Sequence, residues 1–339
     1  MSNDRTEFRG DAMASTRPHR QPDHGQHQHG PSRRGPSAKR PAALRRGLRR
    51  EAPTVIGVLA DPADFTTMTA YPSFAFEDHP SYLRAVHGLL RSLAAQHLHI
   101  SAVLFDPEEF RLFCAEEGLD ADSAAARTCF TAELAASGAG LRYTGQPMDE
   151  LVPELIDQAA RHATWEHATL LLATTSPCTG CGADLARAAV RRARTLLTQV
   201  VEGAGPGHHH LVCSVPVLSG HLLTALHAEH LAPPGPGAPT IRLHEGGRPD
   251  FLTVLAAGLA AQSPGGLVLR SSADSHPDLL RGWRLQRGAP VPLSAAEVFD
   301  AYCTDVESGE PMAPEPGVEY HPGFAVDVPG PHHGHCPRA

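Results

Sequence analysis

Residues 170–192 read LLLATTSPCTGCGADLARAAVRR, and this stretch decides between the possible folds. An apolar run over 168–174 comes first, then a turn with two cysteines and two glycines, and then a helical pattern that continues to about residue 202. A short apolar run bounded by turn residues is typical of a buried strand. The stretch therefore predicts a strand, a turn and a helix, which is the repeating unit of a parallel sheet.

The same alternation extends along the chain on both sides of this stretch. Apolar runs predict further strands at 55–60, 100–105, 140–144, 210–217, 240–243 and 266–270. Helical periodicity and capping residues predict helices at 82–96, 107–117, 121–136, 148–162, 220–230, 251–262 and 294–302. Strands that are apolar throughout are typical of a sheet covered on both faces. We therefore expect an α/β fold with a doubly wound, mostly parallel, Rossmann-like sheet, a disordered N-terminal arm and an irregular C-terminal tail.

Composition divides the 339 residues into three parts. Residues 1–52 predict a disordered basic arm, because they hold little apolar surface to offset the entropy of ordering. We expect residues 53–306 to form the α/β domain, which could divide in two near 203–207 or 232–238. Residues 307–339 form a tail rich in Pro, Gly and His. The first fifty residues carry 12 Lys and Arg against 4 Asp and Glu, whereas the rest carry 17 against 33.

This charge pattern bears on the choice of partner. A basic arm could contact nucleic acid or an acidic partner through charge alone, which makes a regulatory protein one hypothesis. The arm of residues 1–52 has no Trp or Tyr for base stacking, and the body is acidic, so a small anionic molecule is the favoured partner. The sequence has no apolar run long enough to span a membrane and no secretory signal, and we therefore expect a cytoplasmic protein without a membrane partner.

Two rare residue types exclude several reactions. The chain has a single lysine, Lys39, and a single asparagine, Asn3, which indicates a GC-rich genome. Because the predicted domain has no lysine, it can form no Schiff base, and pyridoxal phosphate chemistry is excluded. A P-loop and a protein-kinase catalytic set are excluded for the same reason. Neither the cofactor nor the enzymatic nature of the protein follows from what remains.

The turn after residue 174 is the first candidate site. Thr175 and Ser176 supply hydroxyl groups, while Gly180 and Gly182 allow close approach of the backbone. A helix N-terminus follows, and its N–H groups attract anions. With Arg248 as a counter-charge, these residues predict binding of a nucleotide or phosphorylated metabolite at the carboxyl edge of the sheet.

The two cysteines of the same turn lead to a different hypothesis. Cys178 and Cys181 could act as a thiol pair or as zinc ligands, which would make the protein a thiol-redox or zinc-dependent enzyme. A zinc site needs further ligands, and the nearest in sequence are His208–His210 and Cys213. A packed, unreactive turn is the third interpretation of the pair.

Three further residues are candidates for catalysis. Asp61 and Asp106 each follow a predicted strand and precede a proline. If their strands are neighbours, the two carboxylates meet at one sheet edge and could hold Mg²⁺. The alternative is that each aspartate caps the helix that follows it. His221, at a predicted junction of strand and helix, is a candidate general base.

Overall fold

The computed structural model describes residues 54–218, 220–231, 241–244, 247–273, 276–305 and 308–330. The predicted arm, residues 1–52, lies outside these ranges, as do residues 232–240, which include one predicted sub-boundary. No helix within the described ranges is both long and apolar enough to cross a membrane.

The first part of the described chain is built around a three-stranded sheet, sheet A. Its elements in chain order are β1 (Thr54–Val58), α2 (Pro62–Met68), α3 (His79–Ala95), β2 (Ile100–Leu104), α4 (Pro107–Glu117), α5 (Ala124–Ala136) and β3 (Leu141–Arg142). The strand order is β1-β2-β3, with β1 and β2 parallel and β3 antiparallel to β2. Buried side chains of β1, β2 and the helices form one hydrophobic core. Within it, the rings of Phe105, Phe110 and Phe130 contact one another, with centroids 5.1 to 5.5 Å apart.

A long helix, α6 (Met148–Ala173), leads to the second part of the chain. Leu151 and Leu155 near its start belong to the core of sheet A, whereas Ala168 near its end belongs to a separate second core. The helix therefore supplies side chains to both hydrophobic cores.

The second part is built around a larger sheet, sheet B. Its elements are α7 (Leu185–Ala204), β4 (Gly207–Val217), β5 (Gly220–His230), β6 (Ile241–Leu243), α8 (Arg248–Ala261), β7 (Gly265–Ser272), β8 (Asp278–Gln286), β9 (Ala289–Pro292), α9 (Ala295–Tyr302) and β10 (Val318–Tyr320). The strand order is β10-β8-β7-β4-β5-β6, and β9 pairs with the same strand β8. All of these pairs are antiparallel except that of β10 with β8.

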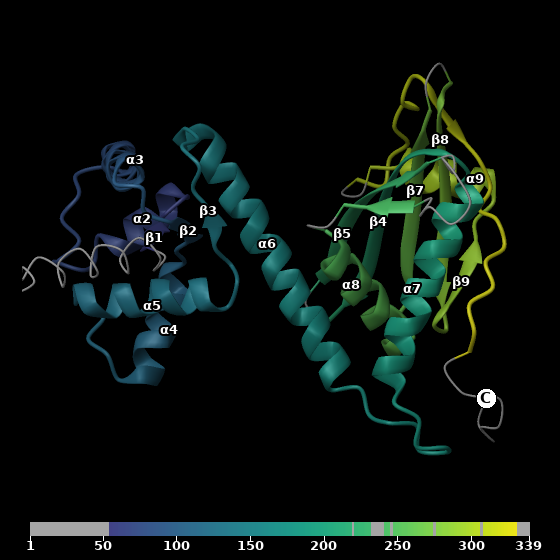
Figure 1. Cartoon of the computed structure of the whole chain (residues 1–339), viewed down its shortest axis with the longest axis horizontal. Helices are drawn as coiled ribbons and strands as arrows, with labels where there is room; N and C mark the ends of the chain where they lie inside the picture. The colour runs from purple at the N-terminus through teal and green to yellow at the C-terminus, as the bar shows by residue number, and fades with distance from the viewer. Residues whose placement is uncertain are drawn as a thin grey trace, which may run out of the picture. The chain divides into compact units, whose positions relative to one another are not determined.

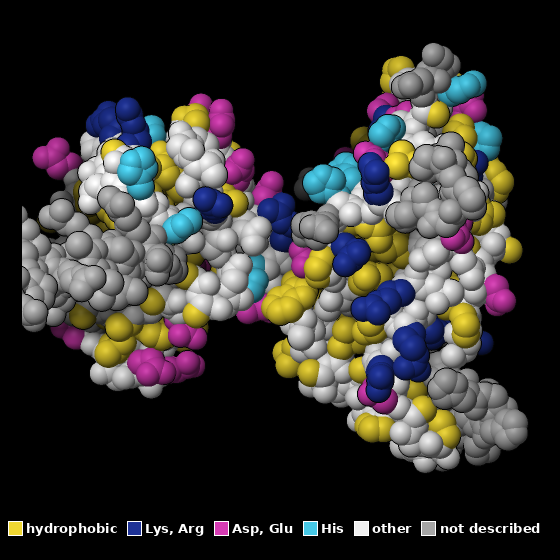
Figure 2. Space-filling model, in the orientation of Figure 1, with side chains coloured by type: hydrophobic (Ala, Val, Ile, Leu, Met, Phe, Trp, Pro, Cys, Tyr) yellow, Lys and Arg dark blue, Asp and Glu magenta, His cyan; other side chains and the backbone are white. Residues whose placement is uncertain are grey.

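Every second side chain of the central strands of sheet B is buried, and these side chains pack against helices α7 and α8 (Figure 1). In β4 the side chains of Leu211, Cys213 and Val215 are at most 1% exposed and point into this core. Helix α7 buries its apolar side chains on one side and exposes arginines on the other. These arginines are among the dark-blue side chains over that helix in Figure 2. The alternate residues of β4, β5 and β7 therefore point away from the core.

The predicted doubly wound, mostly parallel sheet is wrong. Only β1 with β2 and β10 with β8 run parallel among the described strands, and the large sheet is mostly antiparallel. Strands β4 and β5 form a hairpin in which Val217 pairs with Gly220. Such a tight connection joins antiparallel strands, whereas parallel strands need a long crossover.

Two element assignments caused this error. The apolar run 168–174 is the end of helix α6, where Leu170 is 62% exposed while Leu171 and Leu172 pack against the core. A run this short has no periodicity that separates a strand from a helix. The predicted helix 220–230 is strand β5, in which Leu222, Leu226 and Ala228 are buried on one face while Leu223, Ala225 and His227 point to the other.

Several helices were predicted with correct ends, because their capping residues are explicit. Asp106 caps α4, and Ser294 with Glu297 forms a capping box at the start of α9. Strands β8, β9 and β10 were not predicted. Residues 308–330, which the sequence assigned to an irregular tail, include β10 and place Phe324, Val326 and Val328 against the core of sheet B.

Candidate functional site

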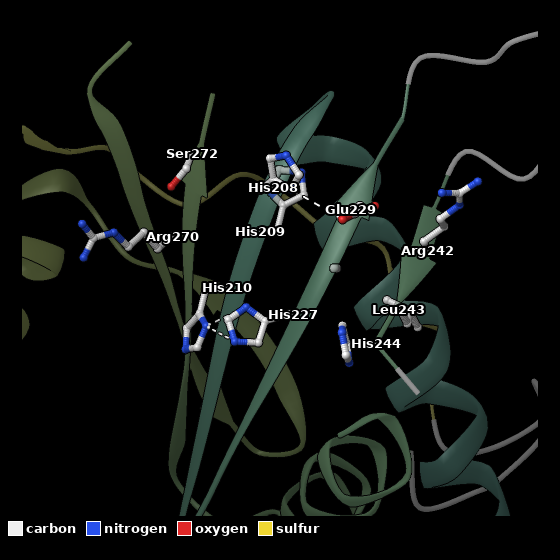
Figure 3. Close-up of a pocket in the computed structure, with 11 residues that line it drawn as sticks. His208, His209, His210, His227, Glu229, Arg242, Leu243, His244, Arg270 and Ser272 are labelled. Atoms are coloured by element: carbon white, nitrogen blue, oxygen red, sulfur yellow. Dashed lines mark hydrogen bonds and ion pairs between the residues drawn. The ribbon is translucent and has the colours of Figure 1, made fainter. Parts of the chain in front are cut away.

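Two rows of polar side chains cross the face of sheet B that points away from α7 and α8, here called the polar face. The strand register sets both rows. The first contains, from β7 to the end of β6, Arg270, His210, His227 and His244. The second contains, in the same direction, Ser272, His208, Glu229 and Arg242. Strands far apart in the sequence therefore place eight polar residues on one surface (Figure 3).

The centre of the first row is a pair of histidines that face each other across β4 and β5 (Figure 3). The Nδ1 atom of His210 lies 3.3 Å from Nδ1 and 3.2 Å from Nε2 of His227. The two rings are 4.3 Å apart between centroids, at an angle of 68°. His244 lies next in the row, held by a 3.0 Å hydrogen bond from its backbone N–H to the carbonyl of His227.

The second row carries a carboxylate, Glu229, and an exposed cation, Arg242. His208 Nδ1 lies 3.7 Å from Glu229 Oε1. Arg242 pairs with Glu229 in the strand register, and its side chain is exposed to solvent. The two rows together line a concave pocket of about 820 Å³. This volume lies within the range of about 300–1,000 Å³ that is typical of small-molecule sites.

The charge of Arg270 is compensated within the fold. Its Nε donates to Asp278 at 2.6 Å, and its two Nη atoms donate to both carboxylate oxygens of Glu315 at 2.9 and 3.1 Å. These bonds hold the pKa of Asp278 and of Glu315 below their usual ranges. Tyr302 donates a further hydrogen bond to Glu315, at 2.8 Å. Arg270 is therefore an anchor of the pocket wall and not a cation available to a ligand.

Among the histidines of the first row, His210 favours the neutral form. Burial lowers the pKa of His210, and the nearby His227 and Arg270 lower it further. A neutral imidazole has one nitrogen lone pair, so it can accept a proton or bind a metal ion. His210 therefore presents a lone pair at the centre of the pocket.

His209 has a structural role on the opposite face of β4. Its side chain is 2% exposed, and its ring nitrogens lie 2.9 Å from the carbonyl of Gly205 and 3.0 Å from Ser271 Oγ. Burial lowers its pKa as well. These contacts orient β4 so that His208 and His210 both point to the polar face.

The cysteines expected at the site lie elsewhere. Cys178 and Cys181 are in the loop between α6 and α7, with Cys178 partly buried and Cys181 exposed. Within that loop, Cys178 donates its backbone N–H to Ala183 and accepts one from Gly182. Cys213, a candidate zinc ligand, is buried in the core, where burial raises the pKa of its thiol to about 12. Whether Cys178 and Cys181 form a reactive or metal-binding pair stays a prediction.

In the loop that was predicted to bind an anion, two of the expected binding groups already have partners within the protein: the hydroxyl of Thr175 and the N-terminus of α7. The Thr175 hydroxyl donates to the carbonyl of Leu171 at 2.8 Å, and Asp184 accepts the N–H of Arg187 at the start of α7. A carboxylate already caps the positive end of this helix. The other residues predicted to bind the anion are exposed: Ser176, Gly180 and Gly182. Gly182 has a φ of +69°. Binding of an anion to this loop stays a prediction.

The two aspartates that follow β1 and β2 do lie at one sheet edge, since these strands are parallel neighbours. Each caps a helix: Asp61 accepts the N–H of Ala63, and Asp106 accepts those of Glu108 and Glu109. Their charges add to the effect of burial in raising the pKa of the nearby Asp64.

No three or more His, Cys, Asp or Glu side chains gather around one point in the part of the chain that the structure describes. A Mg²⁺ site at Asp61 and Asp106, a zinc site at Cys178 and Cys181, or a metal site at His210 and His227 would therefore have to take its remaining ligands from outside these residues.

The last two candidates are apart from the two polar rows. His221 lies on β5 rather than at a helix start, six residues from His227, which corresponds to about 20 Å along a strand. Arg248 is the exposed first residue of α8. Their predicted catalytic and binding roles stay predictions.

The sequence contains a signal for the polar face that was not used. His208 and His210 alternate with buried residues, as do His227 and Glu229, which is the pattern of paired strands. Assigning 220–230 to a helix removed the partner strand, so the cross-strand pair of His210 and His227 could not be predicted. Arg242 and Arg270 could be placed in the rows only from the register.

Comparison with known protein families gives a match to part of the chain. Residues 43–146 match a family described as a domain of unknown function, DUF8829. This segment includes β1 to β3 and ends just before α6, so the two rows of the polar face lie outside it. No curated protein and no solved structure matches the chain.

Proposed function

We propose that the chain binds a divalent transition-metal ion on the polar face of sheet B through His210 and His227. The observation that carries this proposal is the separation of 3.2 to 3.3 Å between their ring nitrogens. Two nitrogen ligands, each about 2.0–2.1 Å from a tetrahedral Zn²⁺ ion, lie about 3.3–3.4 Å from each other. The pair is therefore already spaced for one ion.

Protonation supports the same proposal, and the ring torsion of His227 permits it. His210 Nδ1 lies nearly equidistant from both nitrogens of His227, so the His227 ring must rotate to direct one lone pair at a shared ion. The torsion about its Cβ–Cγ bond is broad and allows this rotation. The lowered pKa of His210 leaves its imidazole neutral at pH 7, the form that binds a metal. Imidazole ligands favour Zn²⁺, Ni²⁺ and Cu²⁺ over Mg²⁺ or Ca²⁺.

Two protein ligands leave at least two coordination positions of a tetrahedral ion for other molecules. A small anion is the natural occupant, because the exposed Arg242 lies in the adjacent row. The anionic ligand expected from the sequence is thereby retained in the proposal, at the polar face instead of the loop after α6. The cytoplasmic location expected from the sequence belongs to the same proposal.

Zinc binding to the full-length protein tests the proposal. Equilibrium dialysis is expected to show that the double variant His210→Ala/His227→Ala binds one equivalent of Zn²⁺ fewer than the unchanged protein. His221→Ala is the matched control, because His221 is exposed on the same strand and the same face but outside both rows. It is expected to retain the full stoichiometry.

A second control separates this site from the cysteine hypothesis. The variant Cys178→Ser/Cys181→Ser is expected to keep the equivalent that depends on the histidines. Loss of zinc in the cysteine variant, together with no change in the histidine variant, would favour the thiol-centred enzyme and contradict the proposal. Equal stoichiometry in all four proteins would also contradict it, since the 3.2 Å contact would then be an N–H···N hydrogen bond between two imidazoles.

A further inference from the structure

A second pocket lies in the first part of the chain, beside sheet A and separate from the polar face. It has a volume of about 330 Å³ and is bordered by β1, α5 and the segment between α2 and α3. Most of its lining is apolar and aromatic: Met68, Phe74, Phe76, Tyr82 and Phe105. All lining residues fall within 43–146, the segment that matches the family.

One charged side chain, Arg127 of α5, also lines this pocket. Its Nη1 atom is buried and has no hydrogen-bond partner among the described residues. Asp122 is close enough for Arg127 to contribute to lowering its pKa, but no ion pair joins the two side chains within the described ranges. The Asp122 carboxylate instead accepts the backbone N–H of Ser73 at 2.8 Å.

The other polar groups around the pocket are satisfied. The Tyr82 hydroxyl accepts the N–H of Leu59 at 3.1 Å and donates to the carbonyl of Gly57 at 3.3 Å. The Thr131 hydroxyl bonds to carbonyls of its own helix at 3.0 and 3.1 Å. A buried donor without a partner costs about 1–3 kcal/mol, so such groups call for an explanation. The guanidinium of Arg127 is thus the group from which a ligand would gain most.

We infer that this pocket binds a small monocarboxylate with an aromatic or branched apolar body, and that Arg127 pairs with its carboxylate. The planar guanidinium offers parallel N–H donors that match the two oxygens of a carboxylate. The aromatic side chains would cover the apolar body. A phosphate dianion fits less well, because moving a doubly charged group into an apolar pocket costs more desolvation.

Calorimetric titration of the full-length protein with phenylacetate tests this inference, with 2-phenylethanol as the uncharged counterpart. Phenylacetate is expected to bind, and 2-phenylethanol is expected to bind about tenfold or more weakly, since a hydrogen bond to a charged group accounts for roughly that factor. Inorganic phosphate, the competing anion, is expected to bind more weakly than phenylacetate.

Variants assign the binding to this pocket. Arg127→Met keeps the length of the side chain and removes its charge, and is expected to weaken phenylacetate binding about tenfold or more. Ala124→Phe fills the pocket from an exposed position at the start of α5 and is expected to abolish binding. Arg91→Met is the control, because Arg91 is exposed on α3 and does not line the pocket.

Three outcomes would overturn the inference: no binding of phenylacetate at millimolar concentration, equal affinity for 2-phenylethanol, or unchanged affinity in Arg127→Met. Tighter binding of phosphate than of phenylacetate would replace the carboxylate with a phosphate ligand and also contradict it. These results do not depend on the metal proposal, because the titrations contain no zinc and the variants leave sheet B unchanged.

Discussion

Single residues in this protein show how a charge is placed for stability or for binding. Arg270 and Arg127 both lie partly buried, but only Arg270 has carboxylate partners within hydrogen-bond distance. A guanidinium with two paired carboxylates is a structural anchor. A guanidinium with an unpaired buried nitrogen costs stability, and a protein can carry such a cost where the residue serves binding.

The pairing of Arg270 predicts a pH dependence of stability. Because the pKa values of Asp278 and Glu315 are lowered in the folded protein, the stability they contribute is fully present above their unfolded values of about 4. It is lost as the pH falls through the lowered folded values. We expect Arg270→Met to lower the melting temperature at pH 7, and the difference from the unchanged protein to shrink below pH of about 4. A difference that stays constant from pH 7 to pH 3 would contradict this assignment.

The buried Nη1 atom of Arg127 has no hydrogen-bond partner among the described residues, so replacing Arg127 is expected not to reduce stability. In the absence of ligand, Arg127→Met is expected to leave the free energy of unfolding unchanged or to raise it by about 1 kcal/mol, because it removes an unsatisfied buried donor. Urea denaturation of the two proteins measures the difference. A loss of more than about 1 kcal/mol would show that Arg127 stabilises the fold and is not held for a ligand.

At the scale of elements, the decisive feature is that residues 220–230 form a strand. Leu223 and Leu226 distinguish the two assignments, since they would share one face of a helix but lie on opposite faces of a strand. The structure places Leu226 in the core at 1% exposure and leaves Leu223 59% exposed.

This difference predicts unequal effects of the same substitution. Leu223→Asp is expected to change the free energy of unfolding by about 0.5 kcal/mol or less, whereas Leu226→Asp is expected to cost more than about 3 kcal/mol, because it buries an unpaired charge. Urea denaturation of the two variants provides the measurement. Similar losses in both would indicate that the two side chains share one buried face.

The elements that could be predicted from sequence are those whose ends carry explicit capping residues, such as α4 after Asp106 and α9 after Ser294. The condition set for a shared site of Asp61 and Asp106, that the strands before them are neighbours, is met by the parallel pair β1 and β2. Short apolar runs could not be assigned, because Leu170–Leu172 fit a strand and a helix end equally well. The pair of His210 and His227 lies on the hairpin of β4 and β5 and was missed because 220–230 was assigned to a helix. The positions of Arg270 and Arg242 depend on the register of β7 and β6, which local patterns do not contain.

At the scale of the whole molecule, the end of the described chain completes sheet B. Strand β10 adds to the edge of the sheet beside β8, and Phe324 then packs on Trp283 with ring centroids 5.0 Å apart. The indole Nε1 of Trp283 donates to the carbonyl of Phe324 at 2.8 Å. The segment after α9 is therefore part of the second hydrophobic core.

This packing predicts that Phe324→Ala lowers the free energy of unfolding by about 2–3 kcal/mol, somewhat less than for a fully buried phenylalanine. The emission of Trp283, one of two tryptophans in the chain, is expected to shift to longer wavelength as water gains access to the indole. Unchanged stability and emission would mean that the segment does not pack on the sheet in solution.

The central claim is that His210 and His227 together bind one metal ion. Anomalous diffraction at the zinc edge, from crystals of the full-length protein soaked in Zn²⁺, tests it most directly. We predict a peak between the two rings, about 2.0–2.1 Å from one nitrogen of each. Zinc peaks only elsewhere, with the two imidazoles still in direct contact, would contradict the claim.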